Sequence, residues 1–206
     1  MKFFSVDSPV YKFMTALTDV FVLSMCWLLC SLPIITIGAS TVALFSVTLK
    51  MVDNEEGYVG RQFFKAFKSN LKQGIVLELI TLLCAYVIWM DFQIFNALEN
   101  GSILILIVAM LTTFLFVFSL AYAYPLTARY VNSVPRILKN SFRISMKYIG
   151  RTVAMLALVA LELAAFNWNL TLIFIEVLIG PACIAYTMSA FAKAIFIKIE
   201  KDNASE

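Results

Sequence analysis

Long apolar runs separated by short polar breaks dominate the chain from residue 13 to residue 192. A membrane-crossing helix needs about 20 predominantly apolar residues. The clearest runs of this kind cover residues 74–95, 102–126, 152–167 and 170–192. Because the hydrocarbon core of a bilayer offers no water to backbone amides, we expect these segments to be helices rather than open strands. The pattern predicts an all-α bundle of transmembrane helices.

The first apolar stretch, residues 13–52, is about twice the length of one membrane-crossing helix. It is interrupted by Pro33 and Gly38. Proline disfavours helical geometry in the residue before it, and glycine relaxes the backbone. We therefore predict a tight corner over residues 31–38 between two spans, 13–32 and 34–52, which makes six spans in all. The alternative is one long bent helix and five spans.

Composition supports lipid as the solvent of this chain. Of its 206 residues, 62% are hydrophobic and 14% are charged, whereas a typical soluble domain is about half apolar and about a quarter charged. The sequence contains no histidine, which excludes serine-histidine triads and histidine-bearing zinc sites. Four cysteines lie in apolar runs without CxxC spacing and are interpreted as small buried hydrophobic residues: Cys26, Cys30, Cys84 and Cys183. We expect neither a metal nor a cofactor, since no glycine-rich nucleotide or flavin motif is visible.

The distribution of basic residues predicts how the spans are threaded. Cytoplasmic loops of membrane proteins are enriched in lysine and arginine, and the six-span arrangement puts all 16 basic residues on one side of the membrane. The opposite side receives the Pro33 corner, the loop 96–101 and the turn 167–169, none of which contains lysine or arginine. We therefore expect a multi-pass protein of a bacterial plasma membrane with both termini in the cytoplasm.

Two basic segments are predicted to form amphipathic helices on the cytoplasmic side, because their charges repeat at the 3.6-residue period of a helix. The basic residues are Arg61, Lys65, Lys68 and Lys72 in the first segment and Arg136, Lys139, Arg143 and Lys147 in the second, which has Leu138, Phe142 and Met146 on another face. Such helices lie in the headgroup plane and bind anionic lipid headgroups. The alternative is a docking surface for a cytoplasmic partner. Nucleic acid is not expected, because membrane orientation alone explains the charge.

The two basic segments align at a constant offset of 75 residues, and each precedes a pair of spans. We infer a duplicated unit within one integral membrane domain, residues 1–206. This domain comprises an N-terminal hairpin (13–52), a basic helix plus hairpin (58–126), a second such unit (134–192) and a cytoplasmic tail (193–206).

Carboxylates within the apolar runs are candidate functional groups, because an ionisable side chain at bilayer depth is costly. The candidates are Asp19, Glu78, Glu162 and Glu176. Glu78 lies about one turn inside its span, where water or Lys72 is within reach. Asp19 lies less than two turns inside its span, where a neighbouring helix or Lys12 is a possible partner.

Glu162 and Glu176 are the more specific pair. They lie seven residues on either side of Asn169, so a tight hairpin brings them to equal depth in adjacent helices. Two carboxyl groups so placed raise one another's pKa and can share a proton or hold a cation. In the alternative arrangement, each forms a structural hydrogen bond to Asn167, Asn169, Trp168 or a neighbouring helix.

Five short motifs stand out: WLLCSLPIITIGAST at residues 27–41, VTLK at 47–50, EEGY at 55–58, FFKAFK at 63–68 and YPLTARY at 124–130. Together they resemble the YesL-like bacterial membrane proteins, a family whose activity is not established. The resemblance implies an accessory role in sugar utilisation, because genes of this family often lie beside carbohydrate uptake systems and glycoside hydrolases. It carries over no catalytic residues. The small residues from Thr36 to Thr41 suit close helix packing or a substrate-lined corner.

Two functions follow as hypotheses. The first is a non-catalytic component that assists or regulates carbohydrate uptake through a transporter or another membrane protein. The second is a small proton-coupled secondary transporter that uses Glu162 and Glu176. A permease subunit of an ATP-driven importer is disfavoured, because neither basic loop has the Glu-Ala-Ala pattern that docks the ATPase. An enzyme is not expected, because the sequence shows no catalytic constellation.

Overall fold

The computed structural model describes residues 9–53, 55, 57–97 and 103–204, and no strand occurs among them. The elements in chain order are α1 (Pro9–Ser31), the 3-10 helix η1 (Ile34–Thr36), α2 (Ile37–Met51), α3 (Val59–Ala97), α4 (Ile103–Leu120), α5 (Ala123–Arg129), α6 (Val134–Lys147), α7 (Ile149–Phe166) and α8 (Leu170–Ala204). The all-α prediction is confirmed.

Six helical segments in the described residues are long and apolar enough to cross a membrane. They are Phe13–Ser31, Ile34–Met51, Val59–Ala97, Ile103–Arg129, Ile149–Phe166 and Leu170–Asp202. The six-span prediction is therefore confirmed over the five-span alternative. At about 1.5 Å of rise per residue, α3 and α8 are each longer than the ~30 Å hydrocarbon core, so both helices extend beyond it.

The corner between α1 and α2 is closed by short polar side chains. The Thr36 hydroxyl donates to the carbonyl oxygens of Cys30, at 2.7 Å, and Pro33, at 2.8 Å. The hydroxyls of Ser31 and Ser40 lie 2.7 Å apart and share a hydrogen bond across the corner. These bonds satisfy carbonyl groups that the break in the helix leaves open, so the chain reverses without exposing unpaired backbone.

Helix α2 is the centre of the molecule. Of its most apolar stretch, 61% is buried, against 6% for the span formed by α4 and α5. It packs against α1, α3, α5 and α8. Its Thr48 is fully buried and shares a 2.7 Å hydrogen bond with Ser189 of α8. A short helix thus organises the longer ones around it.

The crossing of α2 and α3 is very close because glycine lies on both sides of it. A Cβ placed on Gly38 would lie 2.2 Å from the carbonyl oxygen of Gly74. A Cβ placed on Gly74 would lie 2.4 Å from the Cα of Ala39. Small residues allow helix backbones to approach in this way in membrane proteins. Close packing is therefore the observed use of the small residues that follow Thr36.

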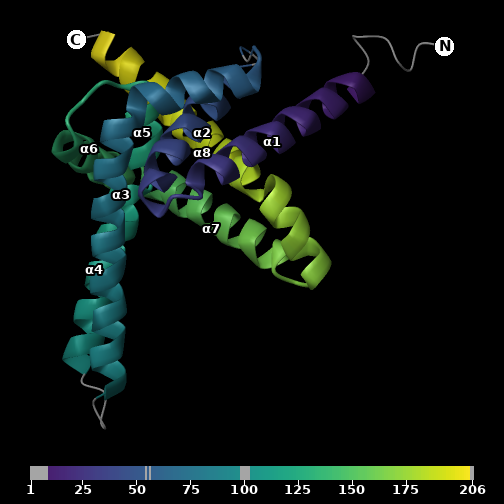
Figure 1. The fold of residues 1–206 in the computed structure, drawn as a ribbon. Helices are drawn as coiled ribbons and strands as arrows, with labels where there is room; N and C mark the ends of the chain where they lie inside the picture. The colour runs from purple at the N-terminus through teal and green to yellow at the C-terminus, as the bar shows by residue number, and fades with distance from the viewer. Residues whose placement is uncertain (1–8, 54, 56, 98–102, 205–206) are drawn as a thin grey trace.

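Three arms extend from this centre (Figure 1). Helix α1 runs away to one side, α3 and α4 form a long hairpin, and α7 with the first part of α8 forms a second hairpin that diverges from the first. Figure 1 also shows α3 crossing the top of the molecule in its first turns before it runs down beside α4. The spans therefore pack together around α2 and diverge from one another away from it.

Helix α8 contains Pro181, which cannot continue the backbone hydrogen-bond ladder. The neighbouring amide of Ala182 donates to the Ser24 hydroxyl of α1 at 3.3 Å. Buried, polar Ser24 thus satisfies a backbone group next to the proline. This contact attaches α8 to α1 beside the apolar cavity described below.

Helix α6 is docked on the end of the α4–α5 span. Its buried residues are Val134, Ile137, Ser141 and Ser145. The Ser145 hydroxyl donates to the Phe118 carbonyl at 2.7 Å, and Ser141 accepts from the Tyr122 amide at 3.1 Å. The predicted face of Leu138, Phe142 and Met146 is only partly covered. The side that faces the protein is therefore a serine-rich side that apolar periodicity does not reveal.

Candidate functional site

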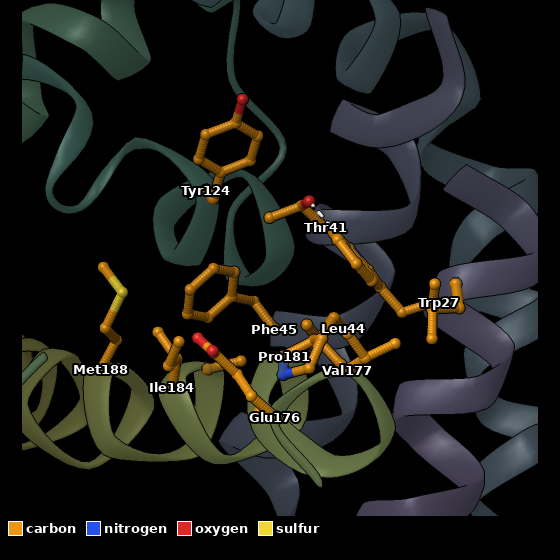
Figure 2. Close-up of a pocket in the computed structure, with 13 residues that line it drawn as sticks. Trp27, Thr41, Leu44, Phe45, Tyr124, Glu176, Val177, Pro181, Ile184 and Met188 are labelled. Atoms are coloured by element: carbon orange, nitrogen blue, oxygen red, sulfur yellow. Dashed lines mark hydrogen bonds between the residues drawn. The ribbon is translucent and has the colours of Figure 1, made fainter. Parts of the chain in front are cut away.

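An apolar cavity of about 480 Å³ lies beside α2, with walls from α1, α2, α5 and α8 (Figure 2). Its volume falls within the range of about 300–1,000 Å³ that is typical of small-molecule sites. The residues that form the walls are Trp27, Leu28, Thr41, Leu44, Phe45, Tyr124, Glu176, Val177, Gly180, Pro181, Ile184, Ala185 and Met188. We take this cavity as the candidate site, because it brings one predicted carboxylate together with aromatic side chains.

Glu176 is the carboxylate of the cavity. Figure 2 shows its side chain rising from α8 toward the ring of Phe45. Gly180, one turn later, makes room for it, since a Cβ there would lie 2.7 Å from the Glu176 Cγ. The amide nitrogen of Asn167 donates to Glu176 Oε2 across 3.4 Å, a long hydrogen bond. The carboxylate therefore stays available to a molecule in the cavity.

Trp27 and Tyr124 are held in place by hydrogen bonds at two sides of the cavity. Trp27 Nε1 donates to the Thr41 hydroxyl at 3.1 Å, which joins α1 to α2. The hydroxyl of Tyr124 points away from Glu176 in Figure 2 and donates to Glu78 Oε2 at 3.0 Å. These bonds fix the orientation of the two rings that face the cavity.

Glu78 differs from the sequence-based expectation. Its side chain is 5% exposed, and its hydrogen-bond donor is Tyr124 rather than Lys72, which is exposed. The Tyr124 hydroxyl also lies 3.0 Å from the Thr81 hydroxyl. The expected pairing with water or Lys72 is wrong, because Glu78 lies on the side of α3 that crosses Gly38 of α2.

Glu162 and Glu176 have different partners. Glu162 Oε1 accepts a 2.6 Å hydrogen bond from the Thr187 hydroxyl, three turns beyond Glu176 along α8. Within the described part of the chain, Glu162 Oε2 is buried without a hydrogen-bond partner. The hydrogen bonds follow the structural alternative, with Asn167 and a neighbouring helix as partners, in place of a proton shared between the two carboxylates.

Asp19 lies in a separate place. It lines a surface hollow of about 790 Å³ between α1 and the start of α3, together with Tyr58 and Arg61. The expected partner Lys12 has a side chain outside the described part of the structure. The hollow brings an acidic residue of one helix beside a basic residue of another.

The two basic segments have different structures. Arg61, Lys65, Lys68 and Lys72 lie exposed on the first turns of α3, which continues into the span without a break. The first basic segment is therefore not separated from its span by a break in the helix, although the first turns of α3 cross the top of the molecule before α3 runs down beside α4 (Figure 1). Its predicted place in the headgroup plane stays a prediction. Arg136, Lys139, Arg143 and Lys147 lie exposed on α6, which ends before α7 begins.

Two ionisable residues, half-buried Asp91 and buried Lys193, were not among the sequence-based candidates. Asp91 lies in the apolar run of α3, and its Oδ2 is buried without a hydrogen-bond partner in the described part of the chain. Lys193 of α8 is buried, forms an ion pair with Asp53 and donates to the Leu49 carbonyl at 3.2 Å. Asp91 could have been found by the same criterion as the other carboxylates, an ionisable side chain within an apolar run. Lys193 could not, because its burial depends on contacts with Leu49 and Asp53, which are distant in the sequence.

A polar cluster joins the end of α5 to the end of α8. Glu200 accepts a 2.9 Å hydrogen bond from the Arg129 guanidinium and a 2.5 Å hydrogen bond from the Tyr130 hydroxyl. Burial, together with the hydrogen bond to Glu200, raises the pKa of Tyr130 to about 12. The cluster attaches the C-terminal part of α8 to the α5–α6 connection.

No group of three or more metal-binding side chains occurs among the described residues. Cys26, Cys30, Cys84 and Cys183 are free thiols and are partly buried. Each of these cysteines lies in a helix, with its thiol partly covered by the protein.

Residues 20–92 match the sequence profile of a family described as "Protein of unknown function, DUF624". This match confirms the resemblance to the YesL-like proteins over α2, about half of α1 and most of α3, and it does not reach the motif at residues 124–130. It includes Trp27, Thr41 and Phe45 of the cavity as well as Glu78 behind it. No curated protein and no solved structure matches the chain.

Proposed function

We propose that this chain, which carries the segment of the YesL-like DUF624 membrane proteins, is a non-catalytic membrane component that works with a carbohydrate uptake system. The observation that carries the proposal is the α3–α4 hairpin, which stands away from the centre of the molecule (Figure 1). Carbohydrate uptake as the process comes from the resemblance to the family.

The hairpin presents large apolar side chains on its outer faces. Examples more than half exposed are Leu83, Tyr86, Trp89 and Phe92 on α3 and Ile107, Met110 and Leu111 on α4. The two helices pack on each other, and α4 also packs on α6 and α5 near the centre. Exposed apolar side chains along two whole helices are covered by lipid or by another membrane protein. A divergent hairpin gives a partner helix access from two sides.

The basic residues supply a second contact region. Those of α3 and α6 are exposed, and we place them on the cytoplasmic side of a bacterial plasma membrane, with both termini on that side. There they bind anionic lipid headgroups and meet the cytoplasmic part of the partner. In this assignment the C-terminal ends of α3 and α7 lie toward the outside of the cell.

Site-specific photocrosslinking tests the proposal. A photoreactive amino acid replaces Tyr86 on α3 or Met110 on α4, and Phe174 of α8, which is 66% exposed on the other hairpin, serves as the matched control. Cells are grown on an oligosaccharide, irradiated, and the adducts identified by mass spectrometry. We expect positions 86 and 110 to crosslink to a subunit of a carbohydrate transporter and position 174 to crosslink to lipid.

Adducts with lipid alone at all three positions contradict the proposal, as do protein adducts that are the same at position 174. Crosslinks between two copies of this chain at positions 86 and 110 also contradict it, because they show that the hairpin is covered by self-association. The control is the protein without a photoreactive amino acid, expressed and irradiated in the same cells.

A second candidate function is a proton-coupled carrier. Two observations favour it: Glu176 opens into a cavity, and Glu162 has a buried oxygen without a partner in the described residues. Because Glu162 and Glu176 have different hydrogen-bond partners, this proposal uses them as two separate carboxylates in place of a facing pair. A carrier of this kind exposes each carboxylate to protons at a different stage of its cycle.

Proton movement in proteoliposomes tests this function. Pyranine is trapped inside, an oligosaccharide panel is added outside, and the Glu162→Gln plus Glu176→Gln double variant is compared with the unaltered protein. We expect acidification that depends on the sugar and is lost in the double variant. Equal acidification in both proteins, or none in either, excludes the carrier.

A further inference from the structure

The cavity beside α2 combines one negative charge with aromatic walls. Glu176 contributes a carboxylate, and Trp27, Phe45 and Tyr124 contribute rings. The remaining lining is aliphatic apart from Thr41 and Met188. Sugars need many hydrogen-bond partners, and this lining offers few. The cavity is therefore suited to an apolar molecule that carries a positive charge.

The charge of Glu176 is not neutralised by the protein around it. The ion pairs among the described residues are Arg129 with Glu200 and Lys193 with Asp53. Its hydrogen bond from Asn167 is long, at 3.4 Å, and comes from a neutral amide. An anionic group away from water gains most from a cationic partner. No lysine or arginine lines the cavity to balance the Glu176 carboxylate. A positively charged ligand would supply this counter-charge.

The rings are rigid, which lowers the entropic cost of binding. Trp27 is fixed by its bond to Thr41, and Tyr124 by its bonds to Glu78 and Thr81. Phe45 is 4% exposed and packed in the core around α2. Aromatic faces attract organic cations within about 6 Å of the ring centre. The same rings bury the apolar substituents of such a cation.

We propose that this cavity binds bulky organic cations, with Glu176 as the counter-charge and Trp27, Phe45 and Tyr124 as the aromatic walls. This inference does not depend on the accessory function or on the carrier.

The position of the cavity gives the direction of entry. Glu176 lies two turns from the α7–α8 turn, and Trp27 lies one turn from the end of α1. Both positions are near helix ends opposite the basic α3 and α6 segments. Under the positive-inside assignment, the cation enters from the outer half of the bilayer.

Binding is measured through the fluorescence of Trp27. Trp89 and Trp168 lie outside the cavity walls and are replaced by Phe, which leaves Trp27 as the reporter. The protein is placed in nanodiscs of zwitterionic lipid and titrated with tetraphenylphosphonium. Tetraphenylborate, which has the same shape and the opposite charge, is titrated in parallel. We expect a saturable change with the cation and none with the anion.

Glu176→Gln is expected to weaken tetraphenylphosphonium binding at least about tenfold, because the counter-charge is lost in a site away from bulk water. Asp91→Asn is the matched control, since it removes a carboxylate from the apolar run of α3, outside the cavity walls. It should leave the dissociation constant within about twofold. Val177→Phe, which narrows the cavity at an unchanged charge, should also abolish binding.

Three results overturn the proposal. Equal affinity in Glu176→Gln and the parent protein shows that the carboxylate is not the counter-charge. Equal responses to the two ions show that the cavity is an apolar groove for lipid acyl chains. An unaltered response in Val177→Phe shows that the probe binds elsewhere. If Glu176→Gln does not fold, Val177→Phe and the comparison of the two ions still decide the question.

Discussion

At the scale of single residues, two glycines determine how closely the central helices approach. Gly38 and Gly74 lie where the backbones of α2 and α3 meet, and a methyl group on either one would overlap backbone atoms of the other helix. The overlap involves backbone, so a side-chain rotation cannot relieve it. The crossing that carries Glu78 behind the cavity therefore depends on the absence of two Cβ atoms.

We predict that Gly74→Ala destabilises the protein by about 1–3 kcal/mol or more, the usual cost of overpacking a tight contact. Gly150→Ala is the control, because a Cβ there meets nothing within 4 Å and alanine favours a helix over glycine. Thermal unfolding in detergent should show a lower Tm for the first variant and an equal or higher Tm for the second. Equal Tm values for both would contradict the close crossing.

Tyr130 makes the stability of the folded protein depend on alkaline pH. Its pKa is raised from 10.0 to about 12, so the folded protein holds this proton more tightly than the unfolded chain. Its contribution to stability is therefore complete below pH 10 and is lost as the pH rises toward 12. The Tyr130 hydroxyl is neutral when protonated. The proton that it loses on titration is the one that it donates to Glu200, so titration also removes this hydrogen bond.

Absorbance at 295 nm should show this titration directly. The difference between the unaltered protein and Tyr130→Phe is expected to have its midpoint near pH 12, and the Tyr130→Phe protein should lose less stability between pH 10 and pH 12. A midpoint near pH 10 would show that the Tyr130 hydroxyl does not make the hydrogen bond to Glu200.

The ionisable residues of the site could be predicted from the sequence, whereas the residues that contact them could not. Glu176 stands out because it is charged within an apolar run, and this rule alone brought it forward. Its neighbours on the cavity wall, Trp27 and Phe45, come from other helices, and apolar periodicity within one helix carries no information on such contacts. The donor to Glu78 is likewise 46 residues away in the chain.

At the scale of helices, the buried ion pair between Lys193 and Asp53 joins α8 to the chain just after α2. Lys193 is buried, whereas the Asp53 side chain is 41% exposed. The two partners are therefore unequal. Removing the aspartate leaves a buried cation without a partner, and removing the lysine leaves a carboxylate that water can solvate.

We predict an asymmetry between the two single variants. Asp53→Asn should cost about 1–3 kcal/mol, below the ~3–5 kcal/mol of a fully buried pair because Asp53 is partly in water. Lys193→Met should cost less, and adding it to Asp53→Asn should restore part of the lost stability. Denaturant unfolding of the three proteins checks this order; a larger loss in Lys193→Met would contradict the burial of the lysine.

Helix boundaries were predictable where the chain contains a breaker. Pro33 and Gly38 marked the corner between α1 and α2, and the corner lies there. Gly74 stands two residues after Lys72, and α3 nevertheless runs through this point as one helix, since a single glycine weakens a helix without having to end it. The second basic segment ends at Tyr148, whose backbone leaves the helical region at φ −118° and ψ 42°. Two similar charge patterns thus lead to different helices.

At the scale of the whole molecule, the number of spans could be predicted and their angles could not. Span length depends on the thickness of the bilayer, which is the same for every helix. The angles depend on contacts such as Gly38 with Gly74 and Ser24 with Ala182, which lie between distant segments. The divergence of the α3–α4 and α7–α8 hairpins in Figure 1 follows from those contacts.

We predict that the six spans keep every basic residue on one face of the bilayer. Single cysteines at positions 65, 139, 96 and 168, in a background with the four native cysteines replaced by alanine, test it with a membrane-impermeant maleimide. In intact spheroplasts we expect labelling at 96 and 168, and at 65 and 139 only after permeabilisation. Labelling of position 65 or 139 from outside intact spheroplasts would contradict the threading and the placement of the cavity.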